Sequence, residues 1–206
     1  MLQAPTELGP AMTEAAAMEN APVPRELFGG ALTAAVPARF VDVSRFRQVP
    51  DTQEVFSDAE TDQSVIVELL EMAEAPDEAA ALFHFNSLAT DNAALSVVLE
   101  QEPIASPLEN GGTRTVCWGL QTVSKFNEGA DSANQVRVHV ACFRLPHIAT
   151  DIVVSYNTPV FISDGSSSAE QVDPLKLATT NSEACLETFT NVWGSLQVLD
   201  YSIFQA

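Results

Sequence analysis

An alternation of apolar and polar residues with a period of two is the feature that most constrains the fold of this chain. It runs through residues 116–122 and 136–142, and a third apolar set with the same spacing occupies residues 152–156. Side chains two residues apart share one face of a β-strand, so each segment predicts a strand with one face packed more fully than the other. A polar connector, residues 127–134, joins the first two segments and predicts a hairpin with a long loop.

Further strands and two helices complete the predicted fold. Four more strand candidates, rich in apolar or β-branched residues, lie at residues 31–36, 53–56, 64–70 and 95–99. One helix is expected to begin at Pro76, with acids in its first turn, and to fade near Asn86. Another follows the capping-box candidate Thr180–Glu183 and places Trp193 in the core. The sequence therefore predicts the α+β class, with an antiparallel sheet of about six strands flanked by helices.

Proline content and composition divide the chain into two parts. Residues 1–26 hold four prolines among Ala and Glu, which predicts a flexible N-terminal tail, and residues 27–206 predict a single domain. No apolar run approaches the ~20 residues that cross a bilayer, so we expect no membrane insertion. Residues 1–21 lack the pattern of a secretory signal, and the three widely spaced cysteines favour a reduced intracellular compartment. Nothing in the sequence indicates an oligomer, so a monomer is expected.

The net charge restricts the possible partners. Nine Lys and Arg residues stand against 28 Asp and Glu residues, which gives a formal charge of −19. Nucleic-acid binding needs basic clusters that neutralise phosphates, so the charge argues against it, and it argues equally against anionic membrane surfaces. A basic protein is the natural complement of such a surface. The alternative is that the charge only keeps the protein in solution.

The sequence holds no recognisable catalytic or metal-binding motif. His139 and Cys142 are three residues apart on a predicted strand, so they point to opposite faces and cannot chelate one ion. The pair Gly29–Gly30 predicts a tight bend, since a phosphate loop would need a longer glycine pattern and a Lys. We therefore expect no catalytic residues, no cofactor and no metal. A catalytic cysteine paired with His84 or His147 stays open as an alternative.

Carboxylates form the richest constellation. Glu68 and Glu71 flank Leu69 and Leu70 at the end of a predicted strand. A helical bend at this point would place both acids on one side, because residues three apart are neighbours on a helix. A strand that stays extended would point them to opposite sides. Solvated charges with no common role are the simpler alternative.

Several motifs together resemble one known family, the Mog family of Ran guanine-nucleotide release factors. They are Leu27-Phe-Gly-Gly30, Asp42-Val-Ser44, Arg47 with Val49-Pro-Asp51, Gln53-Glu-Val-Phe56, Asp62-Gln-Ser64 and Ile66-Val-Glu-Leu-Leu-Glu71. Sparser matches follow at Arg144-Leu-Pro146, Thr150-Asp151 and Asn157-x-Pro159. The resemblance covers about residues 27 to 204 and is densest up to Glu71.

This resemblance carries expectations about fold and function. It implies an α/β/α sandwich like that of the PsbP extrinsic proteins. It implies binding of the small GTPase Ran and release of its guanine nucleotide, chiefly GTP, in support of nuclear protein import, in the nucleus and the cytoplasm. Such a protein is a GTPase regulator and not an enzyme, and a second Ran-binding protein can join the complex. The implied Ran-binding acids are Glu68, Glu71, Asp42, Glu54, Asp62 and Asp51. Arg45 departs from the family pattern, in which an acid can occur, and trims this surface.

Two other functions stay open. The same fold can serve as an adaptor that has exchanged Ran for another partner, such as a cytoplasmic segment of a membrane protein. The acidic surface can also belong to an enzyme that uses a divalent metal ion, which ranks last because no ligand motif accompanies the acids.

Overall fold

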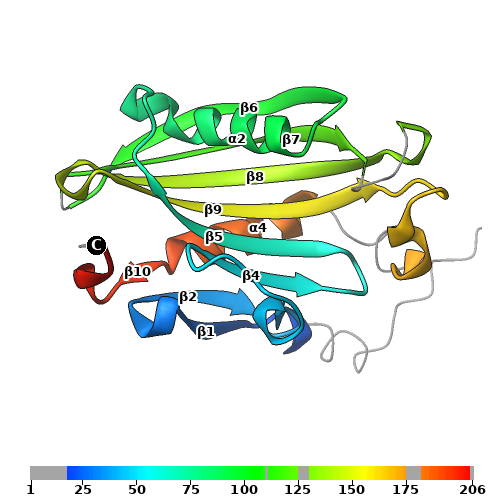
Figure 1. The fold of residues 1–206 in the computed structure, drawn as a ribbon, viewed down its shortest axis with the longest axis horizontal. Coiled ribbons are helices and arrows are strands. Elements are labelled where there is room, and N and C mark those ends of the chain that lie inside the picture. The colour runs from blue at the N-terminus through cyan, green and yellow to red at the C-terminus, as the bar shows by residue number, and fades with distance from the viewer. Residues whose placement is uncertain (1–17, 110, 125–129, 175–181, 205–206) are drawn as a thin grey trace, which may run out of the picture.

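A seven-stranded antiparallel sheet forms the centre of the molecule (Figure 1). The computed structural model describes residues 18–109, 111–124, 130–174 and 182–204. The strand order is β3-β4-β5-β9-β8-β7-β6, and every neighbouring pair is antiparallel. The strands are β3 (Val41–Asp42), β4 (Gln53–Asp58), β5 (Gln63–Glu71), β6 (Ser96–Pro107), β7 (Thr113–Val123), β8 (Asn134–Leu145) and β9 (Thr150–Phe161). The period-two segments are β7, β8 and β9, so the predicted hairpin and sheet are confirmed.

Helix α2 (Ala80–Asp91) covers one face of this sheet, after a 3-10 turn at Asp77–Ala79. The 3-10 turn starts beside the predicted position Pro76 and holds the expected acids, but the α-helix itself begins only at Ala80 and runs past Asn86 to Asp91. Its Phe85 is fully buried and packs directly over β7 at Gly119, where a Cβ atom would lie 2.9 Å from the Phe85 ring. A side chain at residue 119 would therefore push the helix away from the sheet.

A second layer covers the other face and combines a helix with a small sheet. Helix α4 (Ser182–Gly194) lies there beside a three-stranded sheet of order β1-β2-β10. The small sheet consists of β1 (Pro22–Leu27), β2 (Leu32–Pro37) and β10 (Gln197–Val198). A tight bend with positive φ at Gly29 (+66°) and Gly30 (+92°) joins β1 to β2, as the glycine pair predicted.

Strand alternation divides the apolar residues into two cores. On β8, Val138, Val140 and Cys142 face α2, while Ala141 and Phe143 face the α4 side. The α4 side holds the larger core, in which Phe189 of the helix packs with residues of β1, β2, β5 and β9. Both faces of the large sheet are thus covered, which confirms the α+β class and the layered sandwich.

Three details differ from the sequence prediction. Strand β1 begins at Pro22, so Pro22–Glu26 do not belong to a tail, and residues 1–17 lie outside the described residues. The described sheets contain ten strands and not about six, because the small sheet was not foreseen as a separate unit. Trp193 is only partly buried at the rim of the larger core, where the Arg114 guanidinium lies 4.3 Å from the centroid of its ring. Thr180 and Asn181 of the predicted capping box lie outside the described residues.

The described part of the chain contains no helix long and apolar enough to cross a membrane.

Candidate functional site

The open end of the β4–β5 hairpin gathers four of the six predicted site acids. In the register of the two strands Gln53 pairs with Glu68, and the Leu69 N–H donates to the Thr52 carbonyl at 2.9 Å. The start of β4 therefore lies beside the end of β5. This pairing brings together Asp51, Glu54, Glu68 and Glu71.

A hollow of about 360 Å³ opens beside Asp51 and Glu54. It is lined by Phe28, Ser44, Val49, Pro50, Asp51, Gln53, Glu54 and Ile203. The Glu54 carboxylate is fixed, because it accepts a hydrogen bond of 2.6 Å from the Phe28 backbone N–H. Carboxylates beside apolar walls suit a Lys or Arg side chain, whose stem is apolar and whose tip is charged.

Glu68 and Glu71 point to opposite faces of the sheet. Strand β5 stays extended through Glu71, which pairs with Thr150 of β9, so the extended alternative from the sequence holds. Glu68 is half-buried on the α2 face and accepts a 2.6 Å hydrogen bond from Gln53 Nε2. Its burial raises the pKa of the carboxyl group, and the bond from Gln53 opposes that shift. Glu71 is exposed where β5 ends.

Asp42 and Asp62 lie apart from this group. The Asp42 carboxylate accepts the Ser44 N–H at 2.8 Å and lies 3.7 Å from Arg45 Nε, so Arg45 does reduce the negative charge there. Asp62 belongs to the closed end of the hairpin, where it accepts a 2.6 Å bond from Ser168 Oγ. The six residues of β4, from Gln53 to Asp58, separate the two ends by about 17 Å. The six predicted acids therefore do not form one continuous patch.

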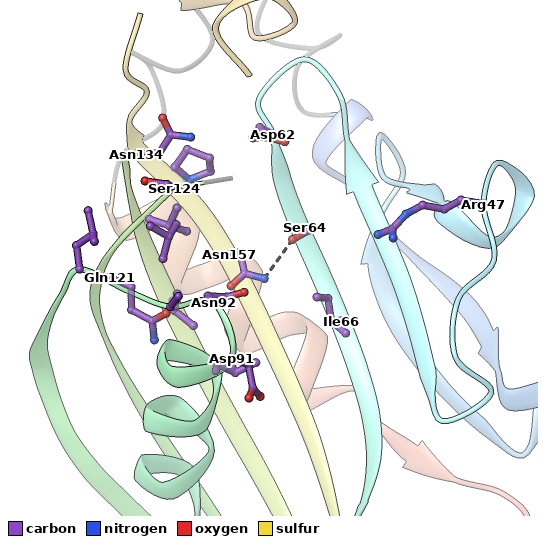
Figure 2. Close-up of a pocket in the computed structure, with 17 residues that line it drawn as sticks. Arg47, Asp62, Ser64, Ile66, Asp91, Asn92, Gln121, Ser124, Asn134 and Asn157 are labelled. Atoms are coloured by element: carbon purple, nitrogen blue, oxygen red, sulfur yellow. Dashed lines mark hydrogen bonds between the residues drawn. The ribbon is translucent and has the colours of Figure 1, made fainter. Parts of the chain in front are cut away.

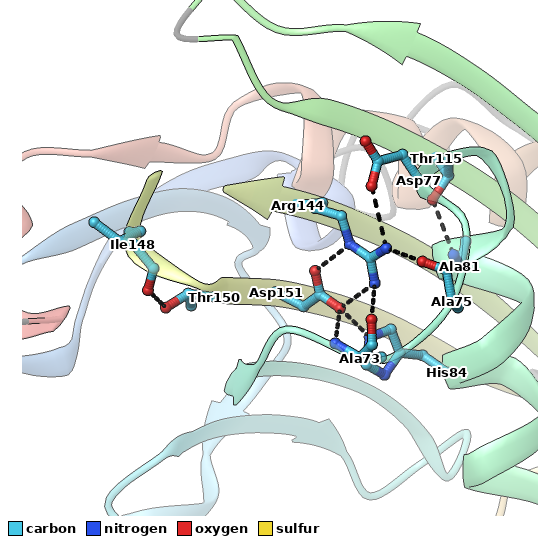
Figure 3. A network of polar contacts seen from close by, with 10 residues as sticks. All are labelled: Ala73, Ala75, Asp77, Ala81, His84, Thr115, Arg144, Ile148, Thr150 and Asp151. Atoms are coloured by element: carbon cyan, nitrogen blue, oxygen red, sulfur yellow. Dashed lines mark hydrogen bonds and ion pairs between the residues drawn. The ribbon is translucent and has the colours of Figure 1, made fainter. Parts of the chain in front are cut away.

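A buried ion pair that the sequence did not reveal lies behind the end of β5 (Figure 3). Arg144 of β8 donates from Nε and Nη2 to the two oxygens of Asp151 of β9, each at 2.9 Å. His84 Nε2 of α2 lies 2.9 Å from Asp151 Oδ2. Arg144 and Asp151 are 1% and 0% exposed, so the pair is withdrawn from water. Both residues fell within motifs of the family resemblance, but nothing in the sequence paired them.

This network fastens the linker between β5 and α2. Asp151 Oδ2 accepts the Ala73 N–H at 3.0 Å, and Arg144 donates to the carbonyls of Ala73 and Ala75 and to Asp77. Burial alone would raise the pKa of Asp151, but the hydrogen bonds from Arg144, His84 and the Ala73 N–H outweigh it and hold the pKa well below its usual range. The carboxylate therefore stays charged and keeps the linker in place.

The same network does not have the chemistry of a metal centre or a nucleophile. His84, Cys142 and Asp151 bring potential ligand atoms within 4.8 Å of one another. Asp151, however, already accepts two bonds from Arg144, and a cation would displace a fixed guanidinium. Burial raises the pKa of the Cys142 thiol, so it is not the thiolate that metal binding or nucleophilic attack requires. The open alternative of a catalytic cysteine beside His84 gains no support.

A larger cleft of about 860 Å³ opens at the C-terminal end of α2 (Figure 2). Its lining is mainly apolar and amide-bearing, with residues from β5, β7, β8 and β9 that include Ile66, Gln121, Asn134, Val138 and Asn157. Asn157 is held by a 3.1 Å bond from its Nδ2 to Ser64 Oγ. The lining also holds the carboxylates of Asp62, one of the six predicted acids, and Asp91, together with Arg47. Among its described residues there is no imidazole, thiol or lysine amine, so the cleft offers carboxylates without a partner base or nucleophile of these kinds.

Comparison with known proteins gives one consistent result. The family model described as Ran-interacting Mog1 protein matches residues 25–159. The chain is 41% identical to the Ran guanine nucleotide release factor of Danio rerio over 191 residues, which are 87% of this chain and 98% of that protein. It is 37% identical to the Ran guanine nucleotide release factor of Homo sapiens, over 82% of this chain and 95% of that protein. It is also 37% identical to the nuclear import protein mog1 of Schizosaccharomyces pombe, over 87% and 98% of the two chains.

A solved structure extends the likeness to the fold. The crystal structure of the Saccharomyces cerevisiae Ran-binding protein Mog1p superposes with a TM-score of 0.65 at 28% sequence identity. The match covers 89% of this chain and 98% of that one. The expected resemblance and the expected fold are both confirmed.

Proposed function

The chain belongs to the family of Ran-interacting Mog1 proteins, and we propose that it binds the GTPase Ran and promotes release of its guanine nucleotide, chiefly GTP. The observation that carries this proposal is the match to the Danio rerio release factor, which spans nearly all of that protein. Relatives named as nuclear import proteins support a role in nuclear protein import, with the protein in both the nucleus and the cytoplasm.

The open end of the β4–β5 hairpin is the surface that we propose for Ran. Asp51 and Glu54 line its hollow, Glu68 lies on the α2 face and Glu71 is exposed at the strand end. Opposite charges steer association and set the orientation of two proteins. Asp42 lies nearer the hollow than Asp62, whose position at the closed end makes it the weakest candidate of the six.

The protein needs no catalytic group of its own for this activity. A binding protein shifts the equilibrium of its partner only when it has different affinities for the two states. We propose that the acidic surface binds basic residues of Ran and prefers the nucleotide-free form. A carboxylate can compete with the nucleotide phosphates for a lysine of the phosphate loop, which would give the required difference in affinity.

The test is the rate of release of fluorescently labelled GTP, and separately of labelled GDP, from purified Ran. We expect this protein to accelerate GTP release and to affect GDP release less. Binding of Ran without faster release of either nucleotide would contradict the release activity and leave an adaptor role as the alternative. Failure to bind Ran, loaded or nucleotide-free, would contradict the whole proposal.

A further inference from the structure

Strand β6 forms an open edge of the seven-stranded sheet (Figure 1). Among the described strands it pairs with β7 alone, across twelve residues from Ser96 to Pro107. Along an edge strand, alternate residues direct their N–H and C=O groups away from the sheet. These groups can form a ladder with another extended chain, so a protein either protects such an edge or uses it.

The second half of β6 is protected against such pairing and the first half is not. The register with β7 shifts between Leu99 and Gln101 and again between Gln101 and Ile104, and Pro103 and Pro107 lack an N–H donor. Bulges and prolines are the common means by which proteins blunt an edge. Residues 96–99 instead pair with β7 in a regular register, without proline or charge.

Three exposed apolar side chains lie on or just before this unprotected run, while the blunted half of β6 holds one, Ile104, at 52% exposed. Val97 is 43% exposed and Val98 is 55% exposed, and Leu95 just before the strand is 57% exposed. Val97 and Val98 are neighbours on a strand and point to opposite faces, so apolar surface is available on both sides of the edge. A strand added here would cover both valines with its own side chains.

Charge decides which kind of chain fits this edge. The segment after the regular run carries Glu100 and Glu102, and β6 contains no Lys or Arg. A second copy would bring the same glutamates and the same formal charge of −19 to this edge, and the mutual repulsion opposes its approach. An incoming chain with Lys or Arg would meet an attractive field, although Glu100 is already paired with Arg137 at 2.7 Å.

We propose that the β6 edge at Ser96–Leu99 accepts an additional strand from an extended segment of a partner protein that alternates β-branched with basic residues. This site is independent of the proposed Ran surface. Strands β4 and β6 are five spacings apart in the sheet, about 24 Å, so both surfaces can be occupied together. The protein would then join Ran at the open end of the β4–β5 hairpin to a second protein at the β6 edge.

The probe is a short synthetic peptide in which valine alternates with lysine, titrated into the full chain labelled with ¹⁵N for NMR. We expect saturable amide shifts confined to Leu95–Leu99 and the facing residues of β7. The same peptide with N-methyl groups on alternate residues cannot form the ladder and should bind at least about tenfold more weakly. A glutamate version of the peptide should not bind.

The variant that tests the edge is Val98→Lys, with Val160→Lys as its matched control. Val160 is 39% exposed at the end of β9, so both changes add one charge at an exposed valine. We expect Val98→Lys to weaken peptide binding at least about tenfold, which is about 1.4 kcal/mol, and Val160→Lys to leave it unchanged. Unchanged circular dichroism and melting temperature would show that both variants fold.

Three results would overturn the proposal. One is equal binding of the N-methylated peptide, which would show attraction by charge without strand addition. Another is an absence of shifts on β6 at saturating peptide. The last is a concentration-dependent dimer in analytical ultracentrifugation that Val98→Lys abolishes, which would make a second copy the occupant. None of these results bears on nucleotide release from Ran, so the two proposals fail separately.

Discussion

Two groups of charged residues meet at the end of β5, and they use charge in opposite ways. Behind the strand, Arg144 and Asp151 are almost wholly buried and bind each other through two hydrogen bonds. At the open end of the hairpin, Asp51 and Glu71 are exposed to solvent. The two buried charges neutralise each other, and their hydrogen bonds hold the linker between β5 and α2 in place. The exposed charge is available to a partner.

This comparison explains how a chain with a formal charge of −19 can fold compactly and still present an acidic surface. An unpaired buried charge costs far more than an exposed one, because nothing replaces the water that it loses. Arg144 is therefore buried directly beside Asp151, whose charge compensates its own. Asp51 and Glu71 instead lie at the surface, where water hydrates them or a basic partner can bind them.

The largest expected effect comes from breaking the buried pair. Arg144→Met leaves Asp151 buried without its main partner and releases the hydrogen bonds to Ala73 and Ala75. We expect a loss of about 3–5 kcal/mol in the free energy of unfolding, measured by urea denaturation. Arg137→Met is the control, since Arg137 forms a more exposed ion pair with Glu100, and it should cost about 1 kcal/mol or less.

The double variant Arg144→Met, Asp151→Leu sharpens that result. It removes both charges at once, so no buried ion is left without a partner. We expect it to recover a large part of the stability that Arg144→Met loses. If the double variant were as unstable as the single one, the loss would arise from packing and not from an uncompensated charge.

His139 provides a buried titratable group without a charged partner. It is 1% exposed, it stacks on Tyr156 and contacts the tilted ring of Phe189, and its Nδ1 has no hydrogen-bond partner among the described residues. Burial lowers the pKa of His139 to about 4 from its usual value near 6.5. Protonation is thus favoured in the unfolded chain, and the protein should lose stability as the pH falls from about 6.5 to about 4.

The expected loss is about 3 kcal/mol once the pH reaches 4, from a shift of about 2.5 units at about 1.4 kcal/mol each. Urea denaturation across this pH range measures it. His139→Phe keeps an aromatic ring in the stack and should flatten the dependence in this window. A profile that is equally steep in the variant would assign the effect to other groups. Below pH 4 the loss of Asp151 ionisation should follow, because its pKa is held low in the folded protein.

The local sequence pattern predicted most of the fold. The parts that it did not predict depend on contacts between residues far apart in the sequence. The period of two in β7, β8 and β9 is written in neighbouring residues, so the sheet could be read from the sequence. The small sheet joins β2 to β10, which are more than 150 residues apart in sequence. The contact between the two strands has only two paired positions, and no local signal marks it.

The candidate site shows the same limit. Motifs and resemblance selected six acids, but the strand register decided that Asp51 and Glu54 share a hollow while Asp62 lies at the other end of the hairpin. The alternation of an extended strand placed Glu68 and Glu71 on opposite faces, which the sequence left open between two readings. The partner of Arg144 could not be predicted either, since a buried ion pair has no periodic signature.

The smallest expected effect on stability, and the one most specific to function, is a charge reversal on the exposed side. Glu71→Lys changes a solvated residue, and Glu68→Lys adds the loss of the bond from Gln53. Since neither carboxylate has a buried ionic partner among the described residues, we expect the double variant to unfold within about 1 kcal/mol of the wild type. Its affinity for Ran should fall at least about tenfold at low salt, measured by isothermal titration calorimetry, and less at high salt.

Glu183→Lys with Glu187→Lys is the matched control for that reversal. Both residues are exposed on α4, so the change in net charge is the same but its location differs. If the loss of Ran affinity followed net charge alone, the two double variants would bind equally weakly and the hairpin end would have no special role. A loss confined to the Glu68 and Glu71 variant would instead show that these positions contact Ran. The effect of a charge therefore depends on its position. Charges behind β5 should act on stability, and an equal number of charges in front of β5 should act on binding.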